Sequence, residues 1–80
     1  MKFKDAIVQR LKEICKERGI SYTQLARLAA VTPSTVYSMF SPERRDVSAN
    51  TLKKLCDGLD LSIIDFFDCD VFRGLEPEVE

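Results

Sequence analysis

The chain has no histidine among its 80 residues and only three cysteines. Cys15, Cys56 and Cys69 are odd in number and widely spaced, whereas a zinc site needs about four ligands at closer spacing. We therefore expect reduced thiols and no metal, with Cys15 and Cys56 as small core residues. The sequence also lacks a Gly-rich phosphate loop and a nucleophile beside an evident base, so neither an enzyme nor a cofactor is predicted.

Long hydrophobic runs are absent as well. No stretch approaches the length needed to cross a membrane, and the first five residues are not followed by the apolar run of a signal peptide. We therefore expect no membrane partner and a cytoplasmic location. No stretch alternates between polar and apolar residues with period two over a useful length, so no sheet is predicted.

The length of the chain suits one small domain. Eighty residues, of which 45% are hydrophobic, suffice for a compact helical bundle. We assign residues 1–75 to this domain and predict that the glutamate-rich residues 76–80 are a frayed acidic end. A domain of this size leaves no room for a second, effector-binding domain, so no small-molecule ligand is predicted.

The charges are segregated along the chain, although the net charge is only −1. Residues 1–45 hold nine Lys or Arg against four Asp or Glu, and residues 46–80 hold three against nine. A basic half of this kind favours contact with a phosphate-rich partner. The alternative is that the asymmetry is only solvated surface.

Residues 19–40 contain two short helical patterns with almost nothing between them. The first begins with a Ser-x-x-Gln capping box, formed by Ser21 and Gln24. The second begins at Thr32 and Pro33, a favoured N-cap followed by a residue that loses no hydrogen bond in the first turn. Apolar residues at helical spacing follow each start: Leu25, Leu28 and Ala29, then Val36, Met39 and Phe40. Only a tight turn fits between the two patterns, so we predict a helix-turn-helix.

Three further helices are predicted around this pair. One spans about residues 4–18 and ends at Gly19, where a left-handed conformation is usual. Another begins after the cap Ser48 and weakens near Gly58. The last is short and spans residues 62–68. The sequence thus predicts an all-α protein with five helices.

This order of residues resembles the Xre, or Cro/repressor, family of helix-turn-helix DNA-binding domains. The matching positions in the motif are Gly19, Ile20, Ser21, Leu25, Ala26, Ala30, Val31, Thr32, Ser34, Thr35 and Val36. The likeness continues through Ser48, Thr51, Leu52, Leu55, the Leu59–Ser62 segment and Phe66–Phe67, so it covers about residues 5–68. The resemblance implies a lambda-repressor-like fold that binds double-stranded DNA through its second and third helices.

The resemblance also implies a set of DNA-binding positions. They are Tyr22, Thr23, Thr32, Pro33, Ser34, Tyr37, Ser38, Ser41, Arg44 and Arg45. Tyr22 stands where the family commonly has a phosphate-binding glutamine, and its hydroxyl could meet a phosphate at the helix start. The alternative for Tyr22 is an aromatic ring that covers the end of the first helix.

The outward face of the third helix carries no Arg, Lys, Asn or Gln, the side chains that bind a purine through two hydrogen bonds. Base reading would then rely on Ser and Thr hydroxyls, on Tyr37 and on contact with thymine methyl groups. Either the specificity is then modest, or the loop and the shape of the DNA supply part of it, and solvated helix surface is the competing interpretation. Arg44 and Arg45 are expected to contact phosphates, unless they belong to an ordinary solvated loop. Arg27, Lys2 and Lys4 are expected to add long-range attraction.

The sequence therefore predicts a small transcriptional regulator, with repression favoured, that acts without an effector domain. The alternative is a protein-interaction module, such as an antitoxin or adaptor, whose helix-turn-helix is degenerate for DNA. The uncharged third helix and the acidic balance favour this alternative, whereas the basic half disfavours it.

The segment 61–75 holds more apolar bulk than one short helix normally buries. At helical spacing, Ile63, Phe66 and Phe67 turn toward the core and Ile64 lies to one side. Val71, Phe72 and Leu75 extend beyond the usual end of the family. They either form the contact surface of a homodimer or fold back on the monomer.

Overall fold

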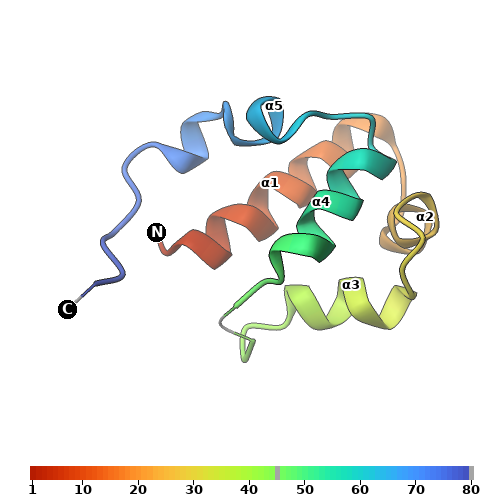
Figure 1. Cartoon of the computed structure of the whole chain (residues 1–80), viewed down its shortest axis with the longest axis horizontal. Helices are drawn as coiled ribbons and strands as arrows, with labels where there is room; N and C mark the ends of the chain where they lie inside the picture. The colour runs from red at the N-terminus through yellow and green to blue at the C-terminus, as the bar shows by residue number, and fades with distance from the viewer. Residues whose placement is uncertain (45, 80) are drawn as a thin grey trace.

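The computed structural model describes residues 1–44 and 46–79, and this part of the chain is all-helical (Figure 1). Its α-helices are α1 (Phe3–Arg18), α2 (Tyr22–Leu28), α3 (Pro33–Phe40), α4 (Ala49–Gly58) and α5 (Ile63–Phe67), followed by the 3-10 turn η1 (Asp70–Phe72). No strand occurs within the described residues. The prediction of a five-helix, all-α domain is confirmed.

Local capping explains most of the helix boundaries. Gly19 ends α1 in a left-handed conformation, with φ of 64°. Ser21 and Gln24 form the predicted capping box, because the Ser21 hydroxyl accepts the backbone N–H of Gln24 at 3.1 Å and the side-chain Oε1 of Gln24 accepts the backbone N–H of Ser21 at 2.7 Å. Ser48 and Ser62 cap α4 and α5 in the same position. These contacts satisfy backbone donors that a helix start leaves without a partner.

Thr32 begins α3 by a different contact from the one predicted. Its side chain makes no capping bond to the backbone, although Pro33 does occupy the first helical position. The Thr32 hydroxyl instead lies 2.9 Å from that of Thr35 and 3.1 Å from that of Ser34. The start of α3 therefore carries a cluster of mutually bonded hydroxyls on its exposed end.

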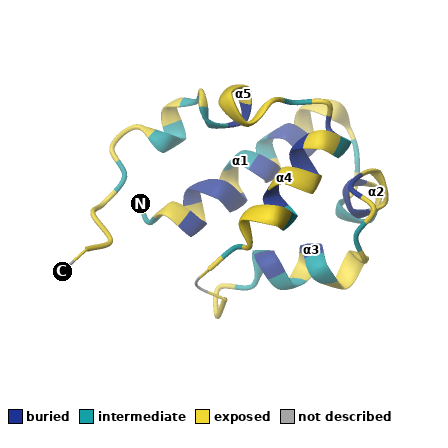
Figure 2. Cartoon of the chain, in the orientation of Figure 1, coloured by how far each residue is buried: buried dark blue, intermediate teal, exposed yellow. Residues whose placement is uncertain are grey.

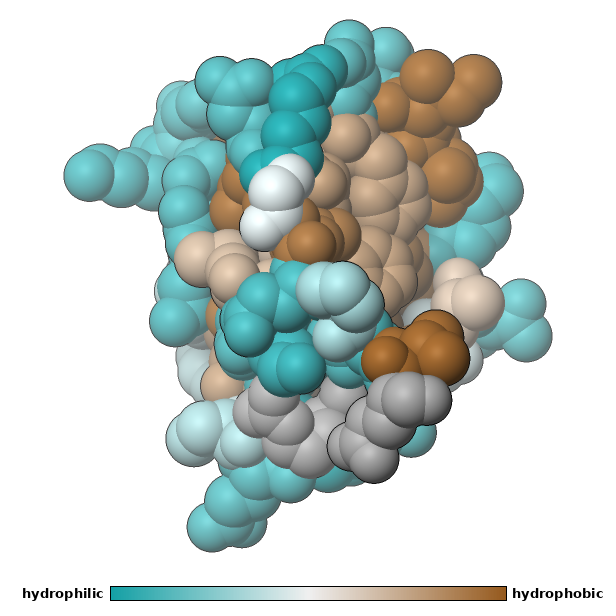
Figure 3. All heavy atoms as spheres, turned by 90° about the vertical axis from the view of Figure 1, so that its left-hand side faces the viewer, coloured by the Kyte–Doolittle hydropathy of each residue, from teal (hydrophilic) through white to brown (hydrophobic). Residues whose placement is uncertain are grey.

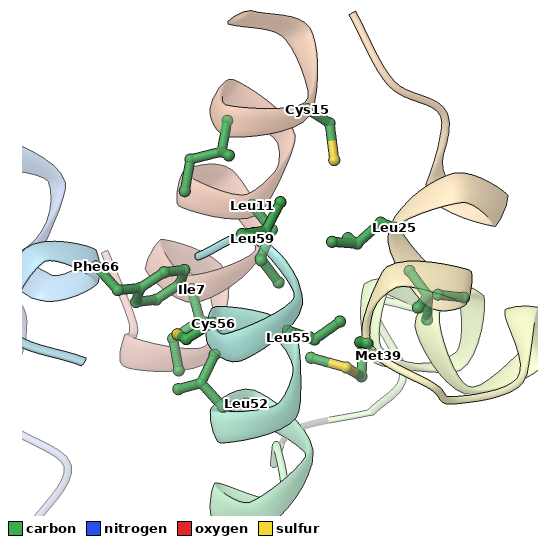
Figure 4. Packing of buried hydrophobic residues seen from close by; sticks show 14 residues of the cluster. Ile7, Leu11, Cys15, Leu25, Met39, Leu52, Leu55, Cys56, Leu59 and Phe66 are labelled. Carbon is green, nitrogen blue, oxygen red and sulfur yellow. The ribbon is translucent and has the colours of Figure 1, made fainter. Parts of the chain in front are cut away.

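The hydrophobic core lies between α1 and α4, and the other helices close its sides (Figures 2 and 4). Its largest fully buried side chains are Leu11 from α1, Leu25 from α2, Val36 from α3, Leu55 and Cys56 from α4, Leu59 at the end of α4 and Phe66 from α5. Each helix thus contributes at least one apolar side chain to a single core, which fixes the position of α3 relative to α4.

Two predicted core residues lie at the margin instead. Leu28 is 54% exposed, because the buried stripe of α2 runs through Leu25, Ala26 and Ala29 and leaves Leu28 on its flank. Ile63, the first residue of α5, is 38% exposed and Phe67 is half-buried, so only Phe66 of the three residues predicted to face the core is fully buried. Ile64 is 79% exposed and lies to one side as expected.

The segment after α5 folds back onto the monomer. The ring of Phe72 packs against those of Phe67 at 4.7 Å, Phe66 at 5.8 Å and Phe3 at 6.3 Å between centroids. Val71 and Leu75 are half-buried. Figure 3 views the side that carries both termini and shows apolar atoms that extend from the centre of this face to its upper right edge. Of the two arrangements that the sequence left open for this segment, the fold-back is the one observed.

Three contacts connect the C-terminal segment to Met1 and to Phe3, the first residue of α1. The Glu76 carboxylate lies 3.0 Å from the Met1 ammonium group. The backbone N–H of Glu76 donates to the Met1 carbonyl at 3.1 Å. The ammonium group lowers the pKa of Glu76 below its ordinary value. The Glu78 carboxylate accepts the backbone N–H of Phe3 at 3.4 Å. The division into a domain of residues 1–75 and a frayed end stays a prediction, but these two residues do have partners.

Candidate nucleic-acid interface

The turn between α2 and α3 is short and internally hydrogen-bonded. The backbone N–H of Ala30 donates to the Arg27 carbonyl at 3.2 Å, and that of Val31 donates to the Ala26 carbonyl at 3.0 Å. Ala30 adopts a left-handed conformation with φ of 57°. Figure 1 shows the result: α2 is seen nearly end-on while α3 runs across the view. The two helices therefore cross at a steep angle, as a helix-turn-helix requires.

The outer face of α3 presents most of the predicted DNA-binding residues together. Val36 and Met39 turn into the core. Four of the predicted residues are exposed and two are half-buried: Thr32, Pro33, Ser34 and Tyr37, then Ser38 and Ser41. This arrangement leaves a polar helix surface that a major groove of about 12 Å width can admit.

Tyr22 packs against α3, a contact that differs from the cover over the end of the first helix that was the alternative for this residue. Its ring meets that of Phe40 edge-on at 4.6 Å and that of Tyr37 at 5.9 Å between centroids. These three rings join the start of α2 to the exposed side of α3. Tyr22 and Thr23 are half-buried, and their phosphate contact stays a prediction.

A hollow of about 360 Å³ adjoins these rings at the junction of α1, α2 and α3. Its lining includes Lys12 and Lys16 of α1 together with Ser21, Tyr22 and Tyr37. The Lys12 ammonium group also lies 5.8 Å from the centre of the Phe40 ring, within range of a cation–π contact. The sequence prediction missed both lysines, although their spacing of four residues places them on one face of α1.

Arg44 lies against the other side of α3. Its Nη1 donates to the Ser38 hydroxyl at 2.7 Å, and its backbone N–H donates to the Ser41 carbonyl at 3.1 Å. A groove of about 400 Å³ runs between α3 and the start of α4 at this place, lined by Ser34, Thr35, Ser38, Met39, Arg44, Asp46, Val47, Ser48 and Thr51. The predicted phosphate contact of Arg45 falls outside the described residues.

Lys4 makes a contact within the protein that the sequence did not predict, and its long-range attraction for DNA stays a prediction. Its side chain is buried at 6% exposure, and Nζ donates to the Ser41 carbonyl at 2.6 Å. A buried ammonium needs such a partner, because burial without one is costly. Ser41 is also bound on its other side, where its hydroxyl accepts the backbone N–H of Glu43 at 3.4 Å. Lys4 and Ser41 together fix the end of α3 and the start of the loop.

The described residues show no other kind of site. Within residues 1–44 and 46–79, no group of three or more potential ligands could hold a metal ion. Burial raises the pKa of the Cys15 and Cys56 thiols above the ordinary value, which keeps them protonated and unreactive near neutral pH. In the same part of the chain, no helix is both long enough and apolar enough to cross a membrane.

The steep α2–α3 pair with its exposed polar face defines a helix-turn-helix DNA-binding domain. Residues 10–71 match the family of Cro/C1-type HTH DNA-binding domains, and the protein belongs to that family. Its fold is similar to that of a solved structure described as the prophage Lp1 protein 11, with a TM-score of 0.80 and 28% sequence identity. That alignment covers 94% of this chain and 100% of the other. The comparison with curated proteins finds no match. The resemblance inferred from the sequence is confirmed.

Proposed function

We propose that this protein binds specific sequences of double-stranded DNA by placing α3 in the major groove, and that it represses transcription from the sites it covers. The observation that carries the proposal is the exposed polar face of α3, held by a hydrogen-bonded turn and backed by Val36 and Met39 in the core. A helix so supported can enter the groove without losing its own packing. Repression is the simplest outcome for a small domain, since occupation of a promoter excludes other proteins. We propose a cytoplasmic location for this activity.

Phosphate contacts on either side of the groove would hold α3 in place. On one side, Lys12 and Lys16 line the same hollow as Tyr22 and Tyr37. Thr23, on the first turn of α2, lies next to the Tyr22 position. These residues offer charge and hydroxyl donors at one edge of α3, which is the arrangement that a DNA strand bordering the major groove would need.

A homodimer would set two copies of α3 about 34 Å apart, one turn of DNA. Because Phe72 packs within the monomer, we propose that the exposed Ile63 and Ile64 of α5 contribute the contact instead. Sedimentation of the protein and of Ile64→Glu at high micromolar concentration tests this proposal. A wild-type protein that stays monomeric both alone and on DNA refutes it.

The DNA-binding proposal is tested by selection from random duplexes, followed by titration at several salt concentrations. We expect enrichment of one sequence and binding that weakens as salt rises, by about 0.9 in log–log slope for each phosphate contact. Lys12→Ala and Lys16→Ala should each reduce the slope by roughly one contact, whereas Lys54→Ala, on the exposed side of α4, should leave it nearly unchanged. If no duplex binds even at low salt, the proposal is wrong and a protein-interaction module is favoured.

A further inference from the structure

We propose that Arg44 reads a guanine in the major groove and that Ser38 positions it for this purpose. The inference rests on the proposed function, because it assigns the source of sequence preference at the same surface. It differs from the role predicted from the sequence, in which Arg44 contacts only phosphate.

The composition of α3 itself limits how it can read bases. Its exposed residues carry hydroxyl groups, a proline ring and a phenol, but no side chain with two hydrogen-bonding atoms in a plane. Strong discrimination between bases comes from such bidentate contacts, and the commonest is an arginine on the O6 and N7 atoms of guanine. A side chain that supplies this contact at α3 must therefore come from a neighbouring segment.

The guanidinium group of Arg44 lies beside α3. Although Arg44 belongs to the loop after α3, its Nη1 lies 2.7 Å from the hydroxyl of Ser38, which lies in the last turn of α3. The guanidinium is thus folded back along the recognition helix rather than extended from the loop. It is planar and carries several N–H donors, so the bond to Ser38 still leaves donors for a base edge.

The backbone of Arg44 is also fixed by a hydrogen bond. The Ser41 carbonyl accepts both the Arg44 backbone N–H at 3.1 Å and the buried Lys4 ammonium at 2.6 Å. The loop therefore starts from a point tied to α1. A side chain held at both its backbone and its tip loses less conformational freedom on binding, which favours a specific contact.

The groove beside Arg44 is also lined by an acidic residue. Asp46 lines the same groove as Arg44, Ser34 and Ser38. A carboxylate repels a charged phosphate more strongly than it repels a guanine edge, which carries acceptor atoms but no net charge. This environment favours a base over the DNA backbone as the partner of Arg44.

The test compares sequences selected from random duplexes by the wild type, Arg44→Lys and Arg44→Ala, each first checked for native helix content and thermal unfolding. We expect the wild type to select a guanine at one fixed position of the site. Arg44→Lys keeps the charge but loses the planar fork, so it should lose this preference while it retains most of the salt dependence. Replacing that guanine by 7-deazaguanine, which lacks N7, should weaken wild-type binding and leave Arg44→Lys unaffected.

The expected loss of preference at that position is about 5- to 150-fold, the range of one bidentate base contact. Ser38→Ala should lose part of it and Ser38→Thr, which retains the hydroxyl, should restore it. Arg27→Ala, which removes an exposed arginine from α2, is the matched control and should weaken all sequences about equally.

Two results overturn the inference while the proposed function stands. One is an Arg44→Lys variant that selects the same site as the wild type, together with an Arg44→Ala variant that weakens every sequence equally. The other is a wild-type site in which 7-deazaguanine costs no affinity at any guanine. If the wild type binds no duplex at all, the proposed function fails and the inference fails with it.

Discussion

The glycine at the end of α4 offers a prediction in which two physical effects have opposite signs. A Cβ atom built on Gly58 would lie 2.6 Å from the Leu28 carbonyl oxygen, 2.7 Å from its carbon and 2.8 Å from the Ala29 nitrogen. All three are backbone atoms at the end of α2, so no side chain can rotate away. Helix propensity alone would make Gly58→Ala stabilising by about 1 kcal/mol. Overpacking of this kind costs about 1–3 kcal/mol and occasionally more.

We expect the steric effect to prevail, because α2 must move for the new methyl group to fit. Gly58→Ala should lower the free energy of unfolding by up to roughly 2 kcal/mol, and each kcal/mol lowers the melting temperature by about 4–8 °C in a domain of this size. Thermal and urea unfolding followed by circular dichroism measure the change. The matched control compares Lys54→Ala with Lys54→Gly, because Lys54 is exposed on the same helix. The Lys54→Ala protein should be more stable than the Lys54→Gly protein by about 1 kcal/mol. A Gly58→Ala protein more stable than the wild type refutes the reasoning.

Three further substitutions test separate features. Ala30→Gly should raise the free energy of unfolding by about 0.5–1 kcal/mol, since Ala30 is exposed and left-handed; a lower melting temperature contradicts this. Phe72→Ala should reduce stability by about 1–3 kcal/mol in urea unfolding, less than for a fully buried ring, and no loss would mean that the fold-back contributes nothing. Asp46→Asn should strengthen binding to all duplexes by about 2- to 5-fold, because it removes a negative charge from the groove. Asp60→Asn, which lies just beyond the end of α4, should not. Equal effects of the two substitutions would contradict the repulsion of phosphate assigned to Asp46.

Helix boundaries were predictable because the signals are local. A capping box, a serine cap or a terminal glycine acts within about four residues, so Gly19, Ser21, Ser48 and Ser62 could be assigned without tertiary information. Gly58 shows the limit of this reasoning. The helix does end there, but the reason for a glycine is the backbone of α2, which is distant in sequence.

Contacts between distant segments account for what the sequence could not predict. The bond from Lys4 to Ser41 joins residues 37 positions apart, and nothing local distinguishes Lys4 from an exposed lysine. The direction of Arg44 depends on the loop conformation. The fold-back of Phe72 was one of two arrangements open from composition, and its packing on Phe66 and Phe67 is a contact that composition does not specify.

Contacts between distant segments also change the interpretation of the basic residues in the N-terminal half. Three basic residues of α1 bind backbone carbonyls within the protein: Lys4 binds that of Ser41, Arg10 binds those of Asp65 and Phe66, and Arg18 binds that of Leu59. Arg10 and Arg18 thus place positive charge at the ends of α5 and α4, where the helix dipole favours it. These three side chains stabilise the fold, so they are not available to phosphates in the way that the sequence alone suggests.

The salt dependence of DNA binding measures how many of these basic residues contact phosphates and how many are bound within the protein. If all nine Lys and Arg of residues 1–45 contacted phosphates, the log–log slope would approach about −8 for each protein chain. With three of them bound internally, we expect a slope no steeper than about −5 per chain. Arg18→Ala should lower the melting temperature but leave the slope unchanged, because its partner is the Leu59 carbonyl at 2.6 Å. Lys16→Ala should do the reverse. A slope near −8, or one that falls in Arg18→Ala, would mean that DNA binding draws these arginines away from the carbonyls that they bind in the free protein.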